Sequence, residues 1–447
     1  MRSRPLEQKK CGDPWKVLCL SLIVLGSGTL RTQTPATEAP AETQLLKTAE
    51  VYFGNDIKPA EEKLFRKTAN GLQADFTIGN TGDDSPDNAA TWKDDRVIRA
   101  NRLAWLLINP QASSQVSPRG VFIDGARIDG ELDLGATKVS FPIRISHSSF
   151  SNSIDLRRAS LRNLDLEGSH TKGLVGDGLN VEQDVFLCCG FKSEGQFWLP
   201  SATIRGALVC TDGQFLNKQG SALLAEGAKI GGTFFMNGGF RAEGEVRLLN
   251  ATIIENFECN GGAFLNEKGS ALNSVNVTFG GNVRCGYGFT TIGQVDFSGA
   301  TIKGAADFSG GSFTNKEGNA LALKADSAIF EKYILFGSGF KSNGCVWLRA
   351  AHIRGDLDVA GANFSNPNSI AMNLTYAKIG TLHFYHGCKI NGQIRLVAAT
   401  IDTSLYWEDL DQPELTIWDL SSTKVKSPAV QRQSWHSRQP ANVWFSF

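Results

Sequence analysis

The chain repeats itself between Gly190 and about Trp407, and this repeat limits its fold more than any other feature does. Four Gly-Phe pairs mark the repeat, and the steps between their phenylalanines are 49, 49 and 51 residues: Phe191, Phe240, Phe289 and Phe340. An isoleucine keeps the same steps, at Ile204, Ile253, Ile302 and Ile353. A second phenylalanine does so too, at Phe215, Phe264, Phe313 and Phe364. A fixed period of this length indicates a repeat architecture.

Within each repeat, pairs of apolar residues two positions apart recur every five to six residues. Val246 and Leu248, and Phe257 and Cys259, are two such pairs. Spacing of two places both side chains on one face of a strand, and the Gly, Asn, Asp and Ser residues between pairs suit tight turns. Four short strands and corners return the chain to its start after roughly 20 residues, so one 49-residue repeat predicts about two coils of a β-solenoid.

A barrel or a β-sandwich also contains many short strands and glycine-rich turns. Those folds need strands of about five or six residues joined by hairpin turns. The apolar pairs here are too short and too evenly spaced for hairpins. The sequence therefore favours an all-β solenoid whose core consists of stacked Phe, Ile, Leu, Val and Ala side chains.

The repeated phrases also resemble a known class of proteins. Three segments carry the likeness: Arg119–Leu134 (RGVFIDGARIDGELDL), Gly227–Phe235 (GAKIGGTFF) and Gly244–Leu248 (GEVRL). They are similar to pentapeptide-repeat proteins, and more narrowly to bacterial repeat proteins labelled membrane-associated or oxidoreductase-like. The resemblance spans residues 45–425 and implies a right-handed, four-sided parallel β-helix. No motif for the oxidoreductase label can be placed in this chain.

The N-terminus is predicted to direct export. Basic residues precede an apolar or small run, Val17–Leu30, which at 14 residues is shorter than the ~20 needed to cross a bilayer. Residues 1–30 therefore indicate a signal peptide, with a short uncleaved membrane anchor as the alternative. Residues 31–43, rich in Pro, Ala, Thr and Glu, indicate a flexible linker.

Three further segments complete the predicted organisation. Residues 44–115 are expected to form a helical cap with helices at Gln44–Phe53, from Pro59 to a stop at Gly71, and at Asn88–Ile108. Such a cap would cover the open strand edges of the first coil; a separate interaction domain is the alternative. The β-helix is expected over 116–425, with an irregular tail at 426–447.

Composition argues against some partners. The chain has 45 Lys and Arg residues and 45 Asp and Glu residues, so its formal net charge is zero. A nucleic-acid-binding protein would show a basic excess, and none is expected as a partner. The sequence predicts a protein or glycan partner, with possible membrane association through the N-terminal apolar run.

The cysteines are expected to be mostly buried free thiols, because their number is odd, nine, and their spacing fits no disulfide framework. Cys210 and Cys259 lie one period apart and Cys285 falls in another apolar ladder, so all three indicate core positions. The adjacent Cys188 and Cys189 leave a redox role open, although no C-x-x-C motif supports it.

The histidines give no clear metal site. His383 and His386 are three residues apart, which in a strand places them on opposite faces unless a corner lies between them. The remaining histidines have no acidic or nucleophilic neighbour in the sequence: His147, His170, His352 and His436.

Carboxylates on one face of a β-helix can form a polysaccharide-cleaving site. The candidates here are Asp129, Asp133, Asp155, Asp165, Asp296, Asp307, Asp356 and Asp358. The period aligns Glu258, Asp307 and Asp358 in one column, but at two coils per repeat they lie about 10 Å apart, which is wide for a shared site. The acidic loop Asp83–Asp87 is a further candidate, for calcium.

The sequence therefore assigns no catalytic, cofactor-binding or metal site. It predicts a non-catalytic scaffold or binding protein that is exported to the periplasm or cell envelope, or is membrane-anchored, and presents flat β-solenoid faces. The alternative is a β-helix enzyme, acting on polysaccharides or in redox chemistry, with an unrecognised site on one face.

Overall fold

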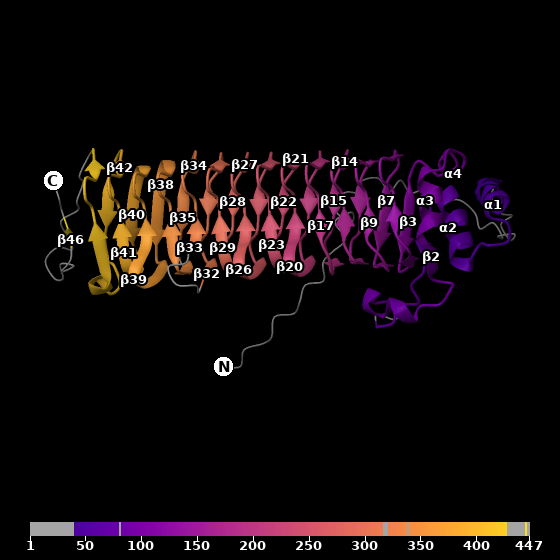
Figure 1. Cartoon of the computed structure of the whole chain (residues 1–447), viewed down its shortest axis with the longest axis horizontal. Coiled ribbons are helices and arrows are strands. Elements are labelled where there is room, and N and C mark those ends of the chain that lie inside the picture. Colours follow the sequence, from indigo (N-terminus) through magenta and orange to yellow (C-terminus); the bar gives the residue numbers. More distant parts are fainter. Residues whose placement is uncertain (1–39, 80–81, 316–320, 338, 427–442, 445–447) are drawn as a thin grey trace, which may run out of the picture.

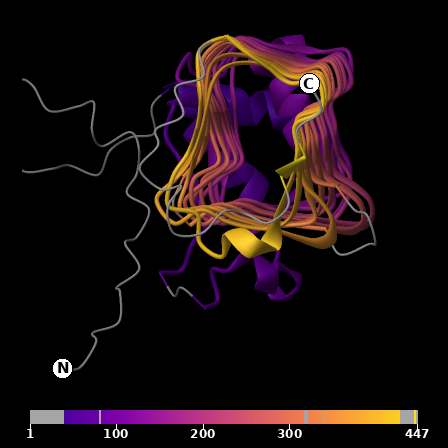
Figure 2. The same ribbon diagram turned by 90° about the vertical axis from the view of Figure 1, so that its left-hand side faces the viewer.

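A computed structural model describes residues 40–79, 82–315, 321–337, 339–426 and 443–444. The described strands stack into an elongated parallel β-solenoid of about 13 turns, with helices at its N-terminal end (Figure 1). Viewed along its long axis, the solenoid has four sides (Figure 2). The predicted fold class, a right-handed, four-sided parallel β-helix with a small helical cap, is confirmed.

Each side of the solenoid is a wall of parallel strands, and one large sheet forms walls 1 and 2. Wall 1 consists of β6 (Lys138–Val139), β10 (Ser160–Leu161), β14 (Asn180–Val181), β18 (Thr203–Ile204), β21 (Lys229–Ile230), β24 (Thr252–Ile253), β27 (Thr278–Phe279), β30 (Thr301–Ile302), β34 (Ile329–Phe330), the starts of β38 (His352–Ala360) and β40 (Lys378–Tyr385), β42 (Thr400–Ile401) and β45 (Lys424–Val425). Wall 2 consists of β1 (Ala74–Asp75), β3 (Val121–Asp124), β7 (Ile143–Ser146), β11 (Leu164–Asp165), β15 (Val185–Phe186), β19 (Leu208–Val209), β22 (Phe234–Phe235), β25 (Phe257–Glu258), β28 (Val283–Arg284), β31 (Ala306–Asp307), β35 (Ile334–Phe336), the ends of β38 and β40, and β43 (Leu405–Trp407).

A second large sheet forms walls 3 and 4, and several of its strands turn the corner between them. Wall 3 consists of β2 (Val97–Arg99), β4 (Arg127–Asp129), β8 (Ser149–Phe150), β12 (His170–Thr171), β16 (Lys192–Ser193), the starts of β20 (Gln214–Leu224), β23 (Arg241–Arg247), β26 (Ala263–Asn273) and β29 (Thr290–Asp296), β32 (Ser312–Thr314), β36 (Lys341–Asn343), and the starts of β39 (Asn363–Asn373) and β41 (Lys389–Arg395). Wall 4 consists of β5 (Leu132–Asp133), β9 (Ile154–Asp155), β13 (Leu174–Val175), β17 (Phe197–Trp198), the ends of β20, β23, β26 and β29, β33 (Leu321–Lys324), β37 (Cys345–Trp347), the ends of β39 and β41, β44 (Thr416–Asp419) and β46 (Val443–Trp444).

The strand register shows that the 49-residue repeat is two coils of unequal length. Thr203 pairs with Lys229, 26 residues on, and Lys229 pairs with Thr252, 23 residues on. The longer coil holds a loop around residues 217–221, where the Asn217 amide donates to the carbonyl of Ser221 at 2.9 Å. Asn266 makes the same bond to Ser270 at 2.8 Å, one repeat later. The sequence prediction of two coils per repeat is confirmed.

Two neighbouring core columns explain why the period is two coils rather than one. In one column, Phe215 and Phe264 flank Ala242, so phenylalanine alternates with a small residue from coil to coil. In the adjacent column, Phe240 contributes the aromatic ring of its coil, and the same position in the preceding and following coils is glycine. A Cβ on one of these glycines, Gly262, would lie only 2.5 Å from the Met236 carbonyl oxygen, so a larger residue does not fit.

The phenylalanines of the two columns form one continuous zigzag stack through the core. Successive ring centroids are 5.1–5.5 Å apart, and the stack comprises Phe191, Phe215, Phe240, Phe264, Phe289, Phe313, Phe340 and Phe364. All eight side chains are fully buried. Contacts at these separations contribute about 0.5–1.5 kcal/mol per pair beyond burial itself.

The N-terminal cap contains α1 (Pro40–Phe53), α2 (Pro59–Ala69), α3 (Ala100–Ile108) and α4 (Pro110–Ser113). Leu64, Phe65 and Leu103 from these helices belong to the same buried core as Ile123 and Ile128 of the first coil. The helices therefore cover the apolar end of the solenoid, and Figure 1 shows them gathered there.

One predicted helix is wrong. Residues 88–108 were expected to be helical throughout, but the segment begins in a 3₁₀ turn, η2 (Pro86–Thr91), and then forms strand β2 before α3 starts. Ile98 of β2 pairs with Ile128 of β4, so the solenoid already begins inside the cap. Arg99 donates to the buried Glu61 of α2 at 2.7 Å, which fixes the strand against the helix.

The predictions for the two ends of the chain concern residues that lie largely outside the described part. The signal peptide at 1–30 lies wholly outside them, and α1 begins at Pro40, within the predicted linker. At the C-terminus, a second 3₁₀ turn, η3 (Pro413–Leu415), precedes β44. β46 pairs with β44, so part of the expected irregular tail, 426–447, is a strand.

Candidate functional site

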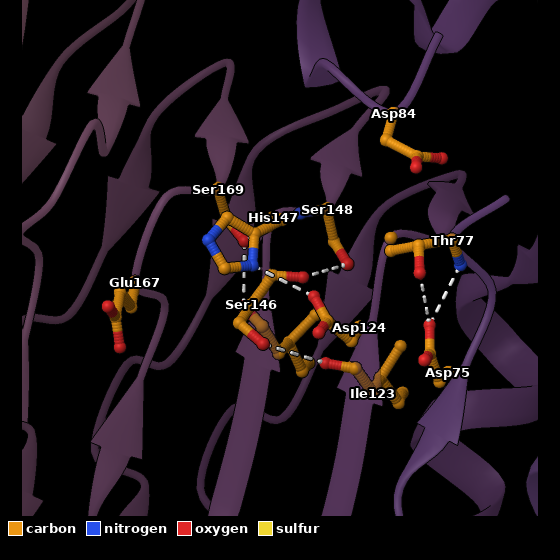
Figure 3. Close-up of polar contacts among 12 residues, drawn as sticks. Asp75, Thr77, Asp84, Ile123, Asp124, Ser146, His147, Ser148, Glu167 and Ser169 are labelled. Atoms are coloured by element: carbon orange, nitrogen blue, oxygen red, sulfur yellow. Dashed lines mark hydrogen bonds and ion pairs between the residues drawn. The ribbon is translucent and has the colours of Figure 1, made fainter. Parts of the chain in front are cut away.

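The most developed polar cluster lies at the N-terminal end of wall 2, around His147 (Figure 3). His147 follows β7 at a corner, where its backbone has a φ of 43°. Its ring Nδ1 lies 2.9 Å from Oδ1 of Asp124, which ends β3 one coil earlier. Asp124 accepts a second hydrogen bond at Oδ2, from Nε2 of Gln73 at 2.9 Å. The corner of the solenoid thus places an imidazole directly against a carboxylate.

The charges around His147 favour its protonated form. The hydrogen bond with Asp124 raises the pKa of His147, partial burial opposes this shift, and the negative charge of Glu167 adds to it. Arg144 pairs with Glu167 at 3.1 Å and lies 3.4 Å from Asp165. Burial nevertheless raises the pKa of Asp165. The cluster is an alternating set of positive and negative groups on one surface.

Three serines lie beside His147, and two of them, Ser146 and Ser148, are its chain neighbours, so the expectation that it has no nucleophilic neighbour is wrong. Their hydroxyls serve the backbone and do not form a hydrolase triad. Ser148 Oγ donates to the Ser146 carbonyl at 2.7 Å and accepts from the Ala126 amide at 3.1 Å. Ser169 Oγ donates to the Ile145 carbonyl at 2.7 Å and accepts from the Ser148 amide at 3.0 Å. Ser146 Oγ donates to the Ile123 carbonyl at 3.4 Å, so all three hydroxyl protons are committed away from His147 (Figure 3). The serines satisfy backbone groups at a buried corner.

The acidic loop does not gather its carboxylates. Asp84 pairs with Arg96 at 2.9 Å and accepts backbone hydrogen bonds from Ile78 and Gly79. Asp87 instead reaches wall 3, where Oδ1 lies 3.2 Å from Nδ1 of His170 and 3.4 Å from Nζ of Lys192. Asp84 ties the loop to the segment before β2, whereas Asp87 ties it to wall 3, and this separation does not fit the calcium site considered from the sequence.

His383 and His386 each lie beside Tyr385 near the C-terminal end of wall 2, and the ring of His383 is 6.1 Å from that of Tyr385. His386 sits at a corner with a φ of 55°, and its ring is 4.4 Å from that of Tyr385. His383 packs 4.8 Å from Tyr406 in the next coil. Tyr385 donates to Asp358 at 2.7 Å, and this hydrogen bond raises the pKa of Tyr385 to about 12. His386 lies at the corner after β40, which is the case that the sequence left open, so the strand rule of opposite faces does not apply to the two histidines.

Most of the candidate aspartates bind neighbours in the wall rather than one another. Asp129 pairs with Arg127 at 2.7 Å, and Asp155 pairs with Arg157. Asp296 lies 3.4 Å from Lys324, while Asp133 and Asp307 accept amides two residues on. Asp356 is exposed.

The predicted acidic column exists but is interrupted. Glu258 and Asp307 are separated by Arg284, which pairs with Glu258, and Leu335 separates Asp307 from Asp358. The carboxylates are therefore two coils apart, as the sequence predicts, and they do not converge.

The cysteines of the repeat are core residues, as expected. Cys210, Cys259 and Cys285 are fully buried, and the strand register places all three with Met236 in one column, which corrects the separate ladder expected for Cys285. Burial raises the pKa values of the Cys210 and Cys259 thiols. Cys188 is also buried, while Cys189 occupies a corner with a φ of 55° and is partly exposed.

Sequence reasoning missed the partners of His147 and His170, because both acids are distant in the chain. Asp124 precedes His147 by 23 residues, which is one coil, and Asp87 comes from the loop before β2. A coil length of 20–23 residues, applied to this stretch, would have placed Asp124 beside His147. Among the described residues, no three His, Cys, Asp or Glu side chains are arranged to hold a metal ion.

These features define the class: the chain is a parallel β-solenoid protein with a helical N-terminal cap. No family model matches the sequence, and no curated protein or solved structure matches it either. None of the helices in the described part of the chain is long and apolar enough to cross a membrane.

Proposed function

We propose that this protein is a non-catalytic scaffold of the cell envelope, which presents the flat walls of its solenoid to a protein or glycan partner. The observation that carries the proposal is the bonding of its polar side chains. Groups that could do chemistry are bound to neighbouring coils, as in the pairs His147–Asp124, Arg284–Glu258 and Tyr385–Asp358. Such cross-coil bonds stiffen a surface and leave few groups to react.

The chain's origin and location are part of the same proposal. The likeness of its repeated phrases to pentapeptide-repeat proteins supports a bacterial source. The basic and apolar N-terminal segment supports export to the periplasm or envelope, or anchoring in a membrane. Cell fractionation tests the location, since recovery of an uncleaved, soluble cytosolic chain would contradict it.

Site-specific crosslinking tests the scaffold role. A photoreactive residue is placed at one outward position of each wall within a single coil, at Thr252, Glu258, Ala263 or Asn273. We expect a crosslink to the same partner from one wall or two adjacent walls. Crosslinks from none of the four positions, or equally from all, would contradict a defined presenting face. The buried Ile253 provides the background.

The enzyme alternative makes a different prediction. A polysaccharide-cleaving site would lose turnover on substitution of one convergent carboxylate, whereas a scaffold has no such residue. Release of reducing sugar from a panel of acidic glycans, abolished by Asp358→Asn and not by Asp307→Asn, would favour the enzyme.

A further inference from the structure

The zero net charge of the chain hides an uneven distribution over the solenoid walls. The outward positions of wall 1 are the first residue of each short strand and the residue two positions later. They hold nine basic side chains: Lys138, Arg162, Arg205, Lys229, Lys303, Arg354, Lys378, Lys424 and Lys426. They hold three acidic ones: Glu182, Glu331 and Asp402. Wall 1 is therefore basic.

Wall 2 has the opposite balance. Its outward positions hold the acids Asp75, Asp124, Asp165, Glu167, Glu258, Asp307, Asp358 and Glu408, against the bases Arg144 and Arg284. The two walls face different directions, so a partner that lies on wall 1 meets mainly the side chains of wall 1 (Figure 2). A partner lying on wall 1 meets a positive field.

Most bases of wall 1 make no ion pair, although Glu182 lies between Arg162 and Arg205 and Glu331 lies between Lys303 and Arg354 in the register of the wall. Arg354 pairs with Glu331, and Lys426 pairs with Asp402 at 2.5 Å. The other seven are exposed and make no ion pair with any residue that the structure describes: Lys138, Arg162, Arg205, Lys229, Lys303, Lys378 and Lys424. On the other walls, by contrast, ion pairs such as Arg241–Glu243 and Arg247–Glu226 are common.

The bases are spread over a plane rather than gathered at a point. They extend from β6 to β45, which at about 4.8 Å per strand is roughly 60 Å. Between them lie neutral residues, including Thr252, Thr278 and Thr301, and Ile254, whose residue surface is 61% exposed. A flat, rigid, positively charged plane with an exposed apolar side chain is complementary to a flat, extended anionic partner.

We infer that wall 1 is a docking surface for the anionic headgroups of a lipid bilayer. A bilayer matches the wall in flatness and extent, and each Lys or Arg near such a surface contributes to binding. A nucleic-acid duplex is curved and would touch only part of a flat wall. The inference extends the proposed function, because it assigns one wall to the membrane and leaves the other three to present partners.

The test uses the full chain and vesicles of phosphatidylcholine with or without phosphatidylglycerol. We expect flotation with the anionic vesicles only, weakening as salt screens the charges. The variant Arg162→Gln/Arg205→Gln/Lys229→Gln/Lys303→Gln should lose at least about tenfold in affinity, from the near-surface contribution of each base. All four side chains are exposed and unpaired, so the fold is expected to survive.

A matched control removes the same charge elsewhere. Lys172→Gln/Lys218→Gln/Arg241→Gln/Lys341→Gln lies on or beside wall 3, opposite wall 1, and should keep the wild-type affinity. Both variants retain the N-terminal segment, so it cannot cause a difference between them. Equal binding by the two variants, or equal binding to neutral vesicles, would overturn the inference.

A duplex DNA oligonucleotide, added as a competitor, tests whether wall 1 binds nucleic acid rather than lipid. If the duplex binds more tightly than the vesicles and the wall 1 variant loses that binding, the lipid assignment is wrong. The crosslinking experiment tests the scaffold proposal separately, because it detects a partner on any wall and needs no membrane.

Discussion

The ring centroid of Phe240 lies 5.5 Å from that of Phe215 in the preceding coil and 5.1 Å from that of Phe264 in the following coil. Phe215 and Phe264 share a core column, and Phe240 belongs to the neighbouring one. Each ring therefore fills the space above and below a small residue. This alternation links every coil to the next and sets the repeat at two coils.

Removing one ring should leave a cavity that the rigid coils cannot close. We expect Phe240→Ala to lower the free energy of unfolding by about 3–5 kcal/mol, since the side chain is fully buried. Phe235→Ala, in the same coil but outward on wall 2, should cost about 1 kcal/mol. Chemical denaturation of the two variants compares them, and equal losses would contradict the stack.

The glycines of the stack should resist even a methyl group. In Gly262→Ala, the new Cβ would lie 2.5 Å from the Met236 carbonyl oxygen and 3.1 Å from Cε2 of Phe264. We expect a loss of about 1–3 kcal/mol from overpacking. Gly220→Ala, in an exposed loop with its nearest contact at 3.5 Å, should be almost neutral. The thermal midpoints of the two variants measure the difference.

The pKa values of His147 and His170 should lie on opposite sides of the pKa of an ordinary imidazole, which is about 6.5. The hydrogen bond to Asp124 raises the pKa of His147, whereas burial lowers the pKa of His170. The stabilisation from protonated His147 is therefore fully present below pH about 6.5 and is lost as pH rises through its folded-state pKa. NMR titration of the ring protons measures both midpoints.

Asp124→Asn tests the cause of the His147 shift. The substitution keeps the shape of the side chain but removes its charge, so the midpoint of His147 should fall while that of His170 stays unchanged. An unchanged His147 midpoint would mean that Asp124 does not hold the imidazole in solution.

The core thiols should be unreactive until the solenoid unfolds. Cys210 and Cys259 are fully buried, and burial raises their pKa values, so neither forms the thiolate that attacks an alkylating reagent. We expect iodoacetamide to leave both unmodified in the folded protein and to modify both in denaturant. Peptide mass spectrometry reads the outcome, with the partly exposed Cys189 as the internal comparison; native modification of Cys259 would contradict its burial.

Periodic features of the fold could be predicted from the sequence because they depend on spacing alone. The positions of Phe191 and Phe240, and the apolar pairs between them, determine the coil and its inward faces. The interruption of the acidic column was predictable for the same reason. Strand register could then be assigned wherever the period holds.

Features that depend on contacts between unlike segments could not be predicted. Val97–Arg99 follows the same apolar spacing as the helix after it, and only pairing with β4 makes it a strand. The bond of Asp87 to His170 joins a loop to a wall and leaves no periodic signal. The charge of wall 1 emerges only when the register has assigned each Lys and Arg to a side.

An exchange of two residues in one coil tests the central claim most directly. Phe240→Ala/Ala242→Phe keeps the composition and core volume but moves the ring into the column of Phe215 and Phe264. We predict that the exchanged protein unfolds at least as easily as Phe240→Ala alone, because three rings then compete in adjacent coils. Recovery of nearly wild-type unfolding free energy would show that the core requires only hydrophobic volume, and would contradict the alternating stack.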